Sequence, residues 1–256
     1  MPAFFKRTPT EKPMRRLAET AMPDAVYAIG DVHGCLAELE RLESLIAADC
    51  AGRAMEPLIV MLGDYVDRGP ASAAVLDHLI AAPPAGFRRI CLSGNHELMM
   101  RSFLAAPQEG HSWLVNGGTE TLVSYGIDPH ALFGSGRRRT TEILASHIPP
   151  EHIEFLAALP ALFTVPGLAF VHAGLRSGIP LAQQADQDML WMRPQEAPYP
   201  LQPFGFVVHG HTPATEPVTQ PGRICIDTGA YATGVLTALR IDGSGKGRFL
   251  QTHPSA

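Results

Sequence analysis

Polar side chains follow three successive apolar runs in the first hundred residues of the chain. The runs Ala25–Ile29, Leu58–Leu62 and Arg89–Leu92 have strand length and are rich in Val, Ile and Leu, which predicts three buried strands. The segments that follow them combine glycines with metal-ligand residue types: Gly30-Asp31-Val32-His33-Gly34, Gly63-Asp64-Tyr65-Val66-Asp67-Arg68-Gly69 and Gly94-Asn95-His96-Glu97. In open α/β sheets, polar residues at the carboxyl ends of strands converge on one crevice. We therefore expect the three segments to form a single site.

Two histidines in the second half of the chain follow the same pattern. The apolar run Leu168–Val171 leads into His172, and Phe206–Val208 leads into His209-Gly210-His211. Asp, His and Asn offer oxygen and imidazole ligands without a thiolate, a set that suits Mn, Fe or Zn. The five segments together predict a dinuclear metal site. The remaining histidines lack this context and are interpreted as packing or surface residues: His78, His111, His130, His147, His152 and His253.

Five ordered motifs resemble the signature of the calcineurin-like metallophosphoesterases, and specifically of the phosphoprotein phosphatase branch with its bacterial and phage-type members. The motifs are GDVHG, GDYVDRG, GNHE, VHAG and GHTP, and the resemblance extends from about Ala25 to Leu239. Three other stretches resemble bacterial members: Asn116-Gly117-Gly118, Leu190-Trp191-Met192-Arg193 and Ile226-Asp227-Thr228-Gly229-Ala230. The resemblance implies an α/β fold, a four-layer sandwich in which two mixed β-sheets stack face to face and are flanked by helices.

The resemblance also implies a set of metal ligands. In this set Asp31 and His33 bind the first metal, Asp64 bridges both metals, and the second metal is completed by Asn95, His172 and His211. The Gly-His-Thr sequence around His211 fits the phosphatase branch, whereas the wider superfamily has two ligating histidines in Gly-His-x-His. His209 is therefore expected outside the ligand set. The implied cofactors are two divalent or trivalent ions, with Mn²⁺ expected and Fe or Zn as alternatives.

The implied reaction is direct attack of a metal-bound hydroxide on phosphorus, without a phosphoenzyme. A serine or threonine alkoxide is a strong base and must be protonated as it leaves. His96 is the candidate general acid, and Asp67 is expected to hold its imidazolium. The candidate phosphate-binding residues are Arg68, Arg193 and Asn95. An alternative interpretation of Arg193 is a surface arginine. Asp227 closes a predicted strand before a glycine, and its alternative interpretation is a residue that only forms the turn.

Three functions remain open at this point. The first is a serine/threonine protein phosphatase that cleaves phosphomonoesters, with relaxed specificity toward phosphotyrosine and small aryl phosphates. The second is a symmetrical bis(5'-nucleosyl)-tetraphosphatase, whose branch tends to lack the acid found here at Asp67 and to carry Asp where this chain has Glu97. The third is a non-catalytic phosphoprotein-binding scaffold, which would be expected to have lost ligands or the acid. Asp67 and the complete ligand set favour the first.

Composition restricts the partners. The net charge of -5 over 256 residues argues against a nucleic-acid backbone as the main partner, and no run approaches the roughly 20 apolar residues that span a membrane. The expected partner is a phosphorylated protein or a small phosphomonoester, and the sequence says nothing of oligomeric state. Four scattered cysteines without a Cys-x-x-Cys pair fit reduced thiols in a cytoplasmic protein. The basic cluster Arg137–Arg139 is interpreted as a solvated loop, with recognition of an acidic or phosphorylated substrate as the alternative.

The chain is expected to form one catalytic domain over residues 23–256, after a flexible leader over residues 1–22 that is rich in Pro, Thr and charge. Residues 110–148 are predicted to form a helical cap beside the metals, and residues 178–203 a long surface excursion. Helices are expected at Leu36–Ile46, Ala71–Ile80, Leu98–Leu104, Thr119–Tyr125 and Glu151–Leu159. Strands of a second sheet are expected at Phe206–His209, Ile224–Asp227, Val235–Ile241 and Arg248–Thr252.

Overall fold

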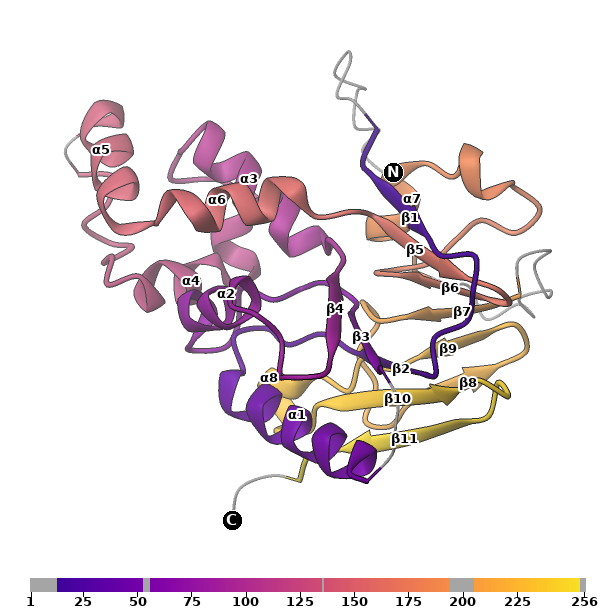
Figure 1. The fold of residues 1–256 in the computed structure, drawn as a ribbon. Coiled ribbons are helices and arrows are strands. Elements are labelled where there is room, and N and C mark those ends of the chain that lie inside the picture. The colour runs from indigo at the N-terminus through magenta and orange to yellow at the C-terminus, as the bar shows by residue number, and fades with distance from the viewer. Residues whose placement is uncertain (1–12, 53–55, 135, 194–204, 254–256) are drawn as a thin grey trace.

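Two β-sheets form the centre of the computed structural model, which describes residues 13–52, 56–134, 136–193 and 205–253 (Figure 1). The strands of the first sheet are β2 (Ala25–Ile29), β3 (Leu58–Met61), β4 (Arg88–Cys91), β10 (Thr237–Asp242) and β11 (Gly247–Gln251). The strands of the second sheet are β1 (Arg16–Ala18), β5 (Leu162–Val165), β6 (Leu168–Val171), β7 (Phe206–His209), β8 (Val218–Gln220) and β9 (Arg223–Cys225). Their spatial orders are β11-β10-β2-β3-β4 and β1-β5-β6-β7-β9-β8.

Both sheets are mixed. Strands β2, β3 and β4 run parallel, while β10 pairs antiparallel with β2. In the second sheet β6, β7 and β9 are parallel, and β5 and β8 are antiparallel to their neighbours β6 and β9. The parallel strands of each sheet carry the motif residues at their carboxyl ends.

Helices cover the outer faces and one end of the sheets (Figure 1). They are α1 (Leu36–Cys50), α2 (Ser72–Ile80), α3 (Asn95–Ala105), α4 (Thr119–Ser124), α5 (Arg137–His147), α6 (Pro150–Ala158), α7 (Asp186–Trp191) and α8 (Ala230–Thr233). A five-residue π-helical turn, η1 (Leu114–Gly118), precedes α4, and a short 3-10 turn, η2 (Leu181–Gln183), precedes α7. None of the helices in the described ranges is long and apolar enough to span a bilayer.

Strand β2 shows why the central strands read as continuous apolar runs. Successive side chains of a strand point to opposite faces. Tyr27 and Ile29 therefore pack with the helices outside the first sheet, while Val26 and Ala28 pack against the second sheet, in a cluster that includes Phe170. All five residues of β2 are buried. A strand buried on both faces cannot alternate polar with apolar residues.

The outer face of the second sheet is covered as well. Leu162, Ala169 and Val207 from this sheet pack with Met189 of α7. The layers are thus helices, first sheet, second sheet and helix, so the predicted four-layer α/β class is confirmed. The four cysteines of the chain are all free thiols.

The predicted leader over residues 1–22 is wrong in its last part. Strand β1 pairs in parallel with β5, and Arg16 lies opposite Leu162. Leu17 packs against the core between the sheets, and the Arg16 guanidinium donates hydrogen bonds to the carbonyls of Leu181 and Ala182. A three-residue edge strand among charged residues has too little apolar periodicity to be recognised from sequence. Residues 1–12 lie outside the described ranges.

The predicted sheet membership of the last two strands is also wrong. Strands β10 and β11 belong to the first sheet, because β10 pairs with β2 from Ala238 opposite Ile29 to Asp242 opposite Ala25. The predicted strands at Phe206–His209 and Ile224–Asp227 do lie in the second sheet, as β7 and, over Arg223–Cys225, β9. Sequence pattern identifies a strand but not its neighbour, since pairing depends on contacts distant along the chain.

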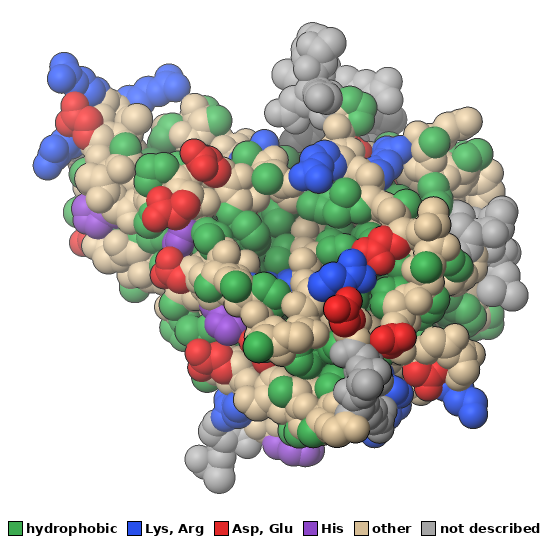
Figure 2. Space-filling view, viewed as in Figure 1, with side chains coloured by type: hydrophobic (Ala, Val, Ile, Leu, Met, Phe, Trp, Pro, Cys, Tyr) green, Lys and Arg blue, Asp and Glu red, His purple; other side chains and the backbone are tan. Residues whose placement is uncertain are grey.

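The region predicted as a helical cap contains η1, α4 and α5. The interpretation of Arg137–Arg139 as a loop is wrong, because these residues form the first turn of α5. Arg138 and Arg139 both pair with Glu142 one turn later, at 3.0 and 3.6 Å, while Thr140 and Leu144 anchor the helix to the core side. Figure 2 shows the basic side chains gathered at this exposed corner. The predicted surface excursion contains η2 and α7, and its residues 194–203 lie outside the described ranges.

Candidate metal centre

The predicted ligands lie at the carboxyl ends of five strands. Asp31 follows β2, Asp64 follows β3, and Asn95 begins α3 after β4. His172 and His211 follow β6 and β7 of the other sheet. Because both sets of strands end on the same side of the sandwich, residues up to 180 positions apart in the chain come into contact, as in the hydrogen bond from the backbone N–H of His211 to Asp31 Oδ2.

Three side chains, from Asn95, His172 and His211, form a first cluster with the carboxylate of Asp64. His172 Nε2 lies 3.3 Å from Asp64 Oδ2, 2.9 Å from Asn95 Oδ1 and 3.2 Å from His211 Nδ1. His211 Nδ1 also lies 2.9 Å from Asn95 Oδ1. Asp64, His172 and His211 are close enough together to hold one metal ion.

The hydrogen bonding of His172 indicates a cation in this cluster. Its Nδ1–H donates to the carbonyl of Leu62 at 3.0 Å, which leaves a lone pair on Nε2 in the neutral ring. That lone pair meets the amide oxygen of Asn95 and the carboxylate of Asp64, which are both acceptors. Acceptors facing each other in a buried site repel unless a proton or a metal ion lies between them. The arrangement therefore fits a bound metal ion.

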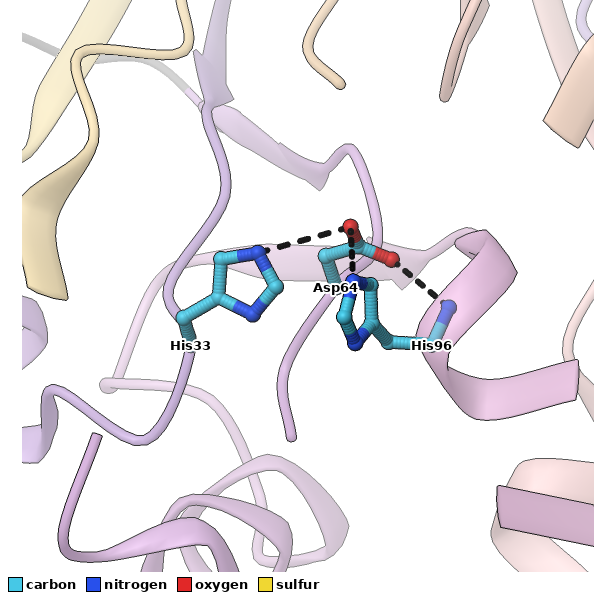
Figure 3. Close-up of side chains that lie close together, drawn as sticks. All are labelled: His33, Asp64 and His96. Atoms are coloured by element: carbon cyan, nitrogen blue, oxygen red, sulfur yellow. Dashed lines mark hydrogen bonds and ion pairs between the residues drawn. The ribbon is translucent and has the colours of Figure 1, made fainter. Parts of the chain in front are cut away.

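A second cluster contains His33, Asp64 and His96 (Figure 3). His33 Nε2 lies 3.5 Å from Asp64 Oδ2, and His96 Nε2 lies 3.9 Å from the same oxygen. His33 Nδ1–H donates to the carbonyl of Val66 at 2.8 Å, while its Nε2 is buried without a hydrogen-bond partner. Burial lowers the pKa of His33 to about 3, so the ring stays neutral and able to ligate.

Asp31 lies beside these clusters but belongs to neither of them as the geometry stands. Its Oδ2 accepts the His211 backbone N–H at 3.0 Å, and its Oδ1 is buried with no hydrogen-bond partner. Burial, together with the charges of Asp227 and Asp64, raises the pKa of Asp31 well above its usual range. A buried carboxylate oxygen and a buried imidazole nitrogen that both lack partners are consistent with a second metal ion.

Backbone strain is concentrated in the same segments. In the part of the chain that the structure describes, every non-glycine residue with a left-handed backbone belongs to one of the motifs: His33, Asp64, Asp67, Arg68 and His211. Their φ angles run from 44° to 76°. Such conformations cost of order 1–3 kcal/mol each and persist where surrounding contacts enforce them, commonly at functional sites.

Glu97 holds the backbone of one of these residues, Asp64, together with its neighbours in the chain. Its carboxylate accepts the backbone N–H groups of Asp64 at 2.8 Å, Tyr65 at 2.7 Å and Gly94 at 2.7 Å. It thereby ties the loop after β3 to the start of α3, which carries Asn95 and His96. Sequence reasoning used Glu97 only to distinguish family branches and missed this role, although a Glu at the third residue of a helix is a known capping signal.

Replacing Glu97 with Gln is expected to destabilise the fold by about 2 kcal/mol, because an NH₂ group would face backbone N–H donors in place of an acceptor oxygen. For a domain of this size that corresponds to a melting temperature about 4–8 °C lower. Thermal unfolding of the metal-free protein measures the change. Glu120→Gln, at an exposed position, is the matched control and should melt like the wild type. An unchanged melting temperature for Glu97→Gln would show that the hydrogen bonds from these backbone N–H groups to Glu97 do not stabilise the fold.

The side chain of His96 is held by Asp67. His96 Nδ1–H donates to Asp67 Oδ2 at 2.6 Å, and both residues are buried. The Arg68 guanidinium donates to His96 Nε2 at 3.1 Å and lies 4.8 Å from the centre of the Tyr231 ring. Burial opposes a charge on His96, but Asp64 and Asp67 together raise its pKa above the ordinary value. The contact between His96 and Asp67 was predicted from the sequence, whereas the position of Tyr231 was not.

Three other residues considered from the sequence, Arg193, Asp227 and His209, lie outside the two clusters. Arg193 is exposed, and its charge, after burial and the charge of His172, contributes to lowering the pKa of His211 to about 3. Asp227 is buried, close enough to Asp31 for its charge to raise the pKa of that residue, and it accepts the Gly229 backbone N–H at 2.9 Å, as a turn-forming residue does. His209 belongs to neither cluster; its Nδ1–H donates to the carbonyl of Gly210.

Residues 25–215 match the model of the calcineurin-like phosphoesterases. The chain belongs to this family. Serine/threonine-protein phosphatase 2 of Salmonella typhimurium (strain LT2) is 26% identical over 226 residues, which cover 84% of this chain and 92% of that protein.

Other similar proteins carry a different name. The symmetrical bis(5'-nucleosyl)-tetraphosphatase of Methylococcus capsulatus is 43% identical over 74 residues, which cover 29% of this chain and only 24% of that enzyme. Among solved structures, a proposed diadenosine tetraphosphatase superposes with a TM-score of 0.64 at 20% identity, over 94% of this chain and 100% of that one. At that identity the likeness concerns the fold alone.

Proposed function

We propose that this phosphoesterase is a dinuclear-metal phosphomonoesterase that acts as a serine/threonine protein phosphatase on a phosphorylated protein or a small phosphomonoester. The observation that carries the proposal is the buried His96–Asp67 pair, at 2.6 Å, whose histidine belongs to one of the two clusters that share Asp64. Similarity over most of the length of a bacterial serine/threonine-protein phosphatase supports it.

We assign one ion to each of the two clusters that share Asp64. Asp31 and His33 would hold one ion, and Asn95, His172 and His211 the other, with Asp64 shared. When bound, such a pair of ions neutralises phosphate charge and makes a nucleophile available from water at neutral pH. Oxygen and imidazole ligands favour Mn²⁺, with Fe or Zn as alternatives.

The chain's own residues then act on the substrate. Arg68 would turn from His96 Nε2 to the phosphate oxygens, with Arg193 and the Asn95 amide as further phosphate contacts. The freed Nε2 of His96 would carry the proton delivered to the leaving oxygen, while Asp67 holds Nδ1–H and stabilises the imidazolium. This arrangement suits a strongly basic leaving group such as the alkoxide of serine or threonine.

A symmetrical dinucleoside tetraphosphatase is the second candidate, favoured by the relatives that carry that name. The leaving group of a nucleotide anhydride is much less basic than an alkoxide, so it depends less on an oriented general acid. The buried His96–Asp67 pair is better matched to a phosphomonoester.

One assay distinguishes the candidates. Purified, manganese-loaded protein is expected to hydrolyse a phosphoserine peptide and p-nitrophenyl phosphate with higher kcat/KM than diadenosine tetraphosphate. Phosphate release and chromatography of the nucleotides measure the three reactions side by side. Preference for the dinucleotide by tenfold or more would replace the phosphatase proposal with the tetraphosphatase one. Binding of a phosphopeptide without hydrolysis of any substrate would support a scaffold instead.

A further inference from the structure

One short segment of the cap, Trp113–Gly118, contacts both Asp67 and Arg68. The indole Nε1–H of Trp113 is shared between the two carboxylate oxygens of Asp67, at 2.9 Å to Oδ1 and 2.8 Å to Oδ2. The carbonyl of Gly117, in the same segment, accepts the backbone N–H of Arg68 at 3.2 Å. The segment is the π-helical turn η1 with its preceding residue, and it is kinked at Asn116 and Gly117.

The carboxylate of Asp67 is surrounded by donors. Oδ2 accepts His96 Nδ1–H as well as the indole, and Oδ1 accepts the hydroxyl of Thr121 at 2.7 Å. Thr121 Oγ1 also accepts the Asp67 backbone N–H at 2.8 Å. Asp67, Trp113 and Thr121 are all fully buried. A carboxylate in such a place is held in one orientation by these bonds, because water is excluded.

Two glycines allow the segment to pack closely against Arg68 and allow the Trp113 indole to pack against the segment's own backbone. Gly117 has φ 105°, and a side chain there would come within 2.7 Å of the Arg68 backbone nitrogen. At Gly118 a Cβ would lie 2.4 Å from the indole ring of Trp113. The glycines of the Asn116-Gly117-Gly118 stretch thus leave the space that these contacts need. They allow the Trp113 indole to reach the Asp67 carboxylate and the Gly117 carbonyl to reach the Arg68 backbone N–H.

We propose that Trp113 is a positioning residue for the His96–Asp67 pair: its indole N–H fixes the Asp67 carboxylate so that His96 Nδ1 is held and Nε2 is directed to the leaving group. This inference rests on the proposed phosphomonoesterase function. Trp113 touches no substrate atom in this scheme and acts only through Asp67. Through the Gly117 carbonyl, the same segment sets the backbone of Arg68.

The first test is spectroscopic and needs no substrate. The chain has two tryptophans, so ¹⁵N-indole labelling gives two N–H resonances, which Trp113→Phe and Trp191→Phe assign. The experiment uses the full-length chain, with and without diamagnetic Zn²⁺. The indole N–H proton of Trp113 is expected to exchange slowly with solvent, and its chemical shift is expected to change in Asp67→Asn, while the chemical shift of the Trp191 indole stays the same. If the chemical shift of the Trp113 indole N–H is the same in Asp67→Asn as in the wild type, the proposal is overturned.

The second test is kinetic. Trp113→Phe keeps the ring and removes the N–H, and is expected to lower kcat on a phosphoserine peptide roughly tenfold, with KM and metal content unchanged. On p-nitrophenyl phosphate the loss should be much smaller, because its phenolate leaves without a proton. In the Asp67→Asn background Trp113→Phe should add less than about twofold, since both changes act on one interaction.

Two further variants separate hydrogen bonding from packing. Phe103→Leu alters packing against the indole, whose ring centre is 4.8 Å away, but leaves the N–H in place, so it should not discriminate between the substrates. Thr121→Val removes another donor to Asp67 and should reproduce the selective loss of Trp113→Phe if that variant folds poorly. Equal losses on both substrates, in both backgrounds, would assign Trp113 to packing alone. The indole measurement still decides the inference if the wild-type protein hydrolyses neither ester.

Discussion

Replacing Asp64 with Asn is expected to lower metal content and phosphatase activity together. Asp64 is the residue shared by the two clusters, with Oδ2 3.3 Å from His172 and 3.5 Å from His33. Asn has nearly the same shape, and its amide oxygen can still accept the His96 backbone N–H now bound by Oδ1. The change therefore removes one negative charge from between the two ions and leaves the fold intact.

The expected loss of kcat/KM exceeds roughly 100-fold, because even partners outside the ligand shell are worth 10- to 100-fold in metalloenzymes. Elemental analysis of the purified protein should find at most one ion per chain where the wild type holds two. Asp128→Asn, the same change at an exposed acid of the cap, is the control and should retain both metal and activity. Full metal occupancy in Asp64→Asn would remove Asp64 from the bridging position.

His96→Asn is the second substitution with a large expected effect, and it should act differently. General acid catalysis is typically worth 10²–10⁴ in rate, so turnover of a phosphoserine peptide should fall by that factor. Metal content should stay at the wild-type value, and p-nitrophenyl phosphate should lose less, because its leaving group needs no proton.

Metal analysis of His96→Asn also decides between two interpretations of the geometry. His96 lies close enough to His33 and Asp64 to be a ligand, although its Nε2 is 3.9 Å from the carboxylate and accepts a hydrogen bond from Arg68. A loss of metal in His96→Asn, or equal losses on alkyl and aryl esters, would make His96 a ligand and not the acid. His147→Asn, at an exposed helix end, serves as control.

The positions of the predicted ligands could be read from sequence because each one adjoins a strand. Apolar runs such as β2 and β3 are recognisable by composition, and Asp31 and Asp64 follow them within three residues. Strands that run parallel in a sheet must place their following residues at one edge, so local pattern alone was enough to predict that these side chains meet.

Trp113 and Thr121 could not be found in the same way. They lie 46 and 54 positions from Asp67, in a part of the chain whose described residues form no strand, and no periodicity connects an indole N–H with a carboxylate at that distance. Within the segment that contains Trp113, only Asn116-Gly117-Gly118 stood out from the sequence, through its resemblance to bacterial members of the family. The tight contacts of its two glycines with Arg68 and the indole explain that pattern once the fold is known.

The sequence by itself determined the strands that carry the motifs and the residues at their ends, because these depend on neighbours in the chain, and the resemblance of those motifs to a known family implied the class of fold. Only the tertiary structure decided that β10 joins β2, that Arg16–Ala18 closes the edge of the second sheet, and which donors surround Asp67. Those features arise from pairing and packing between distant segments. The free energy of these pairings and hydrogen bonds depends on which surfaces pack together, and this cannot be predicted from a local pattern of residues.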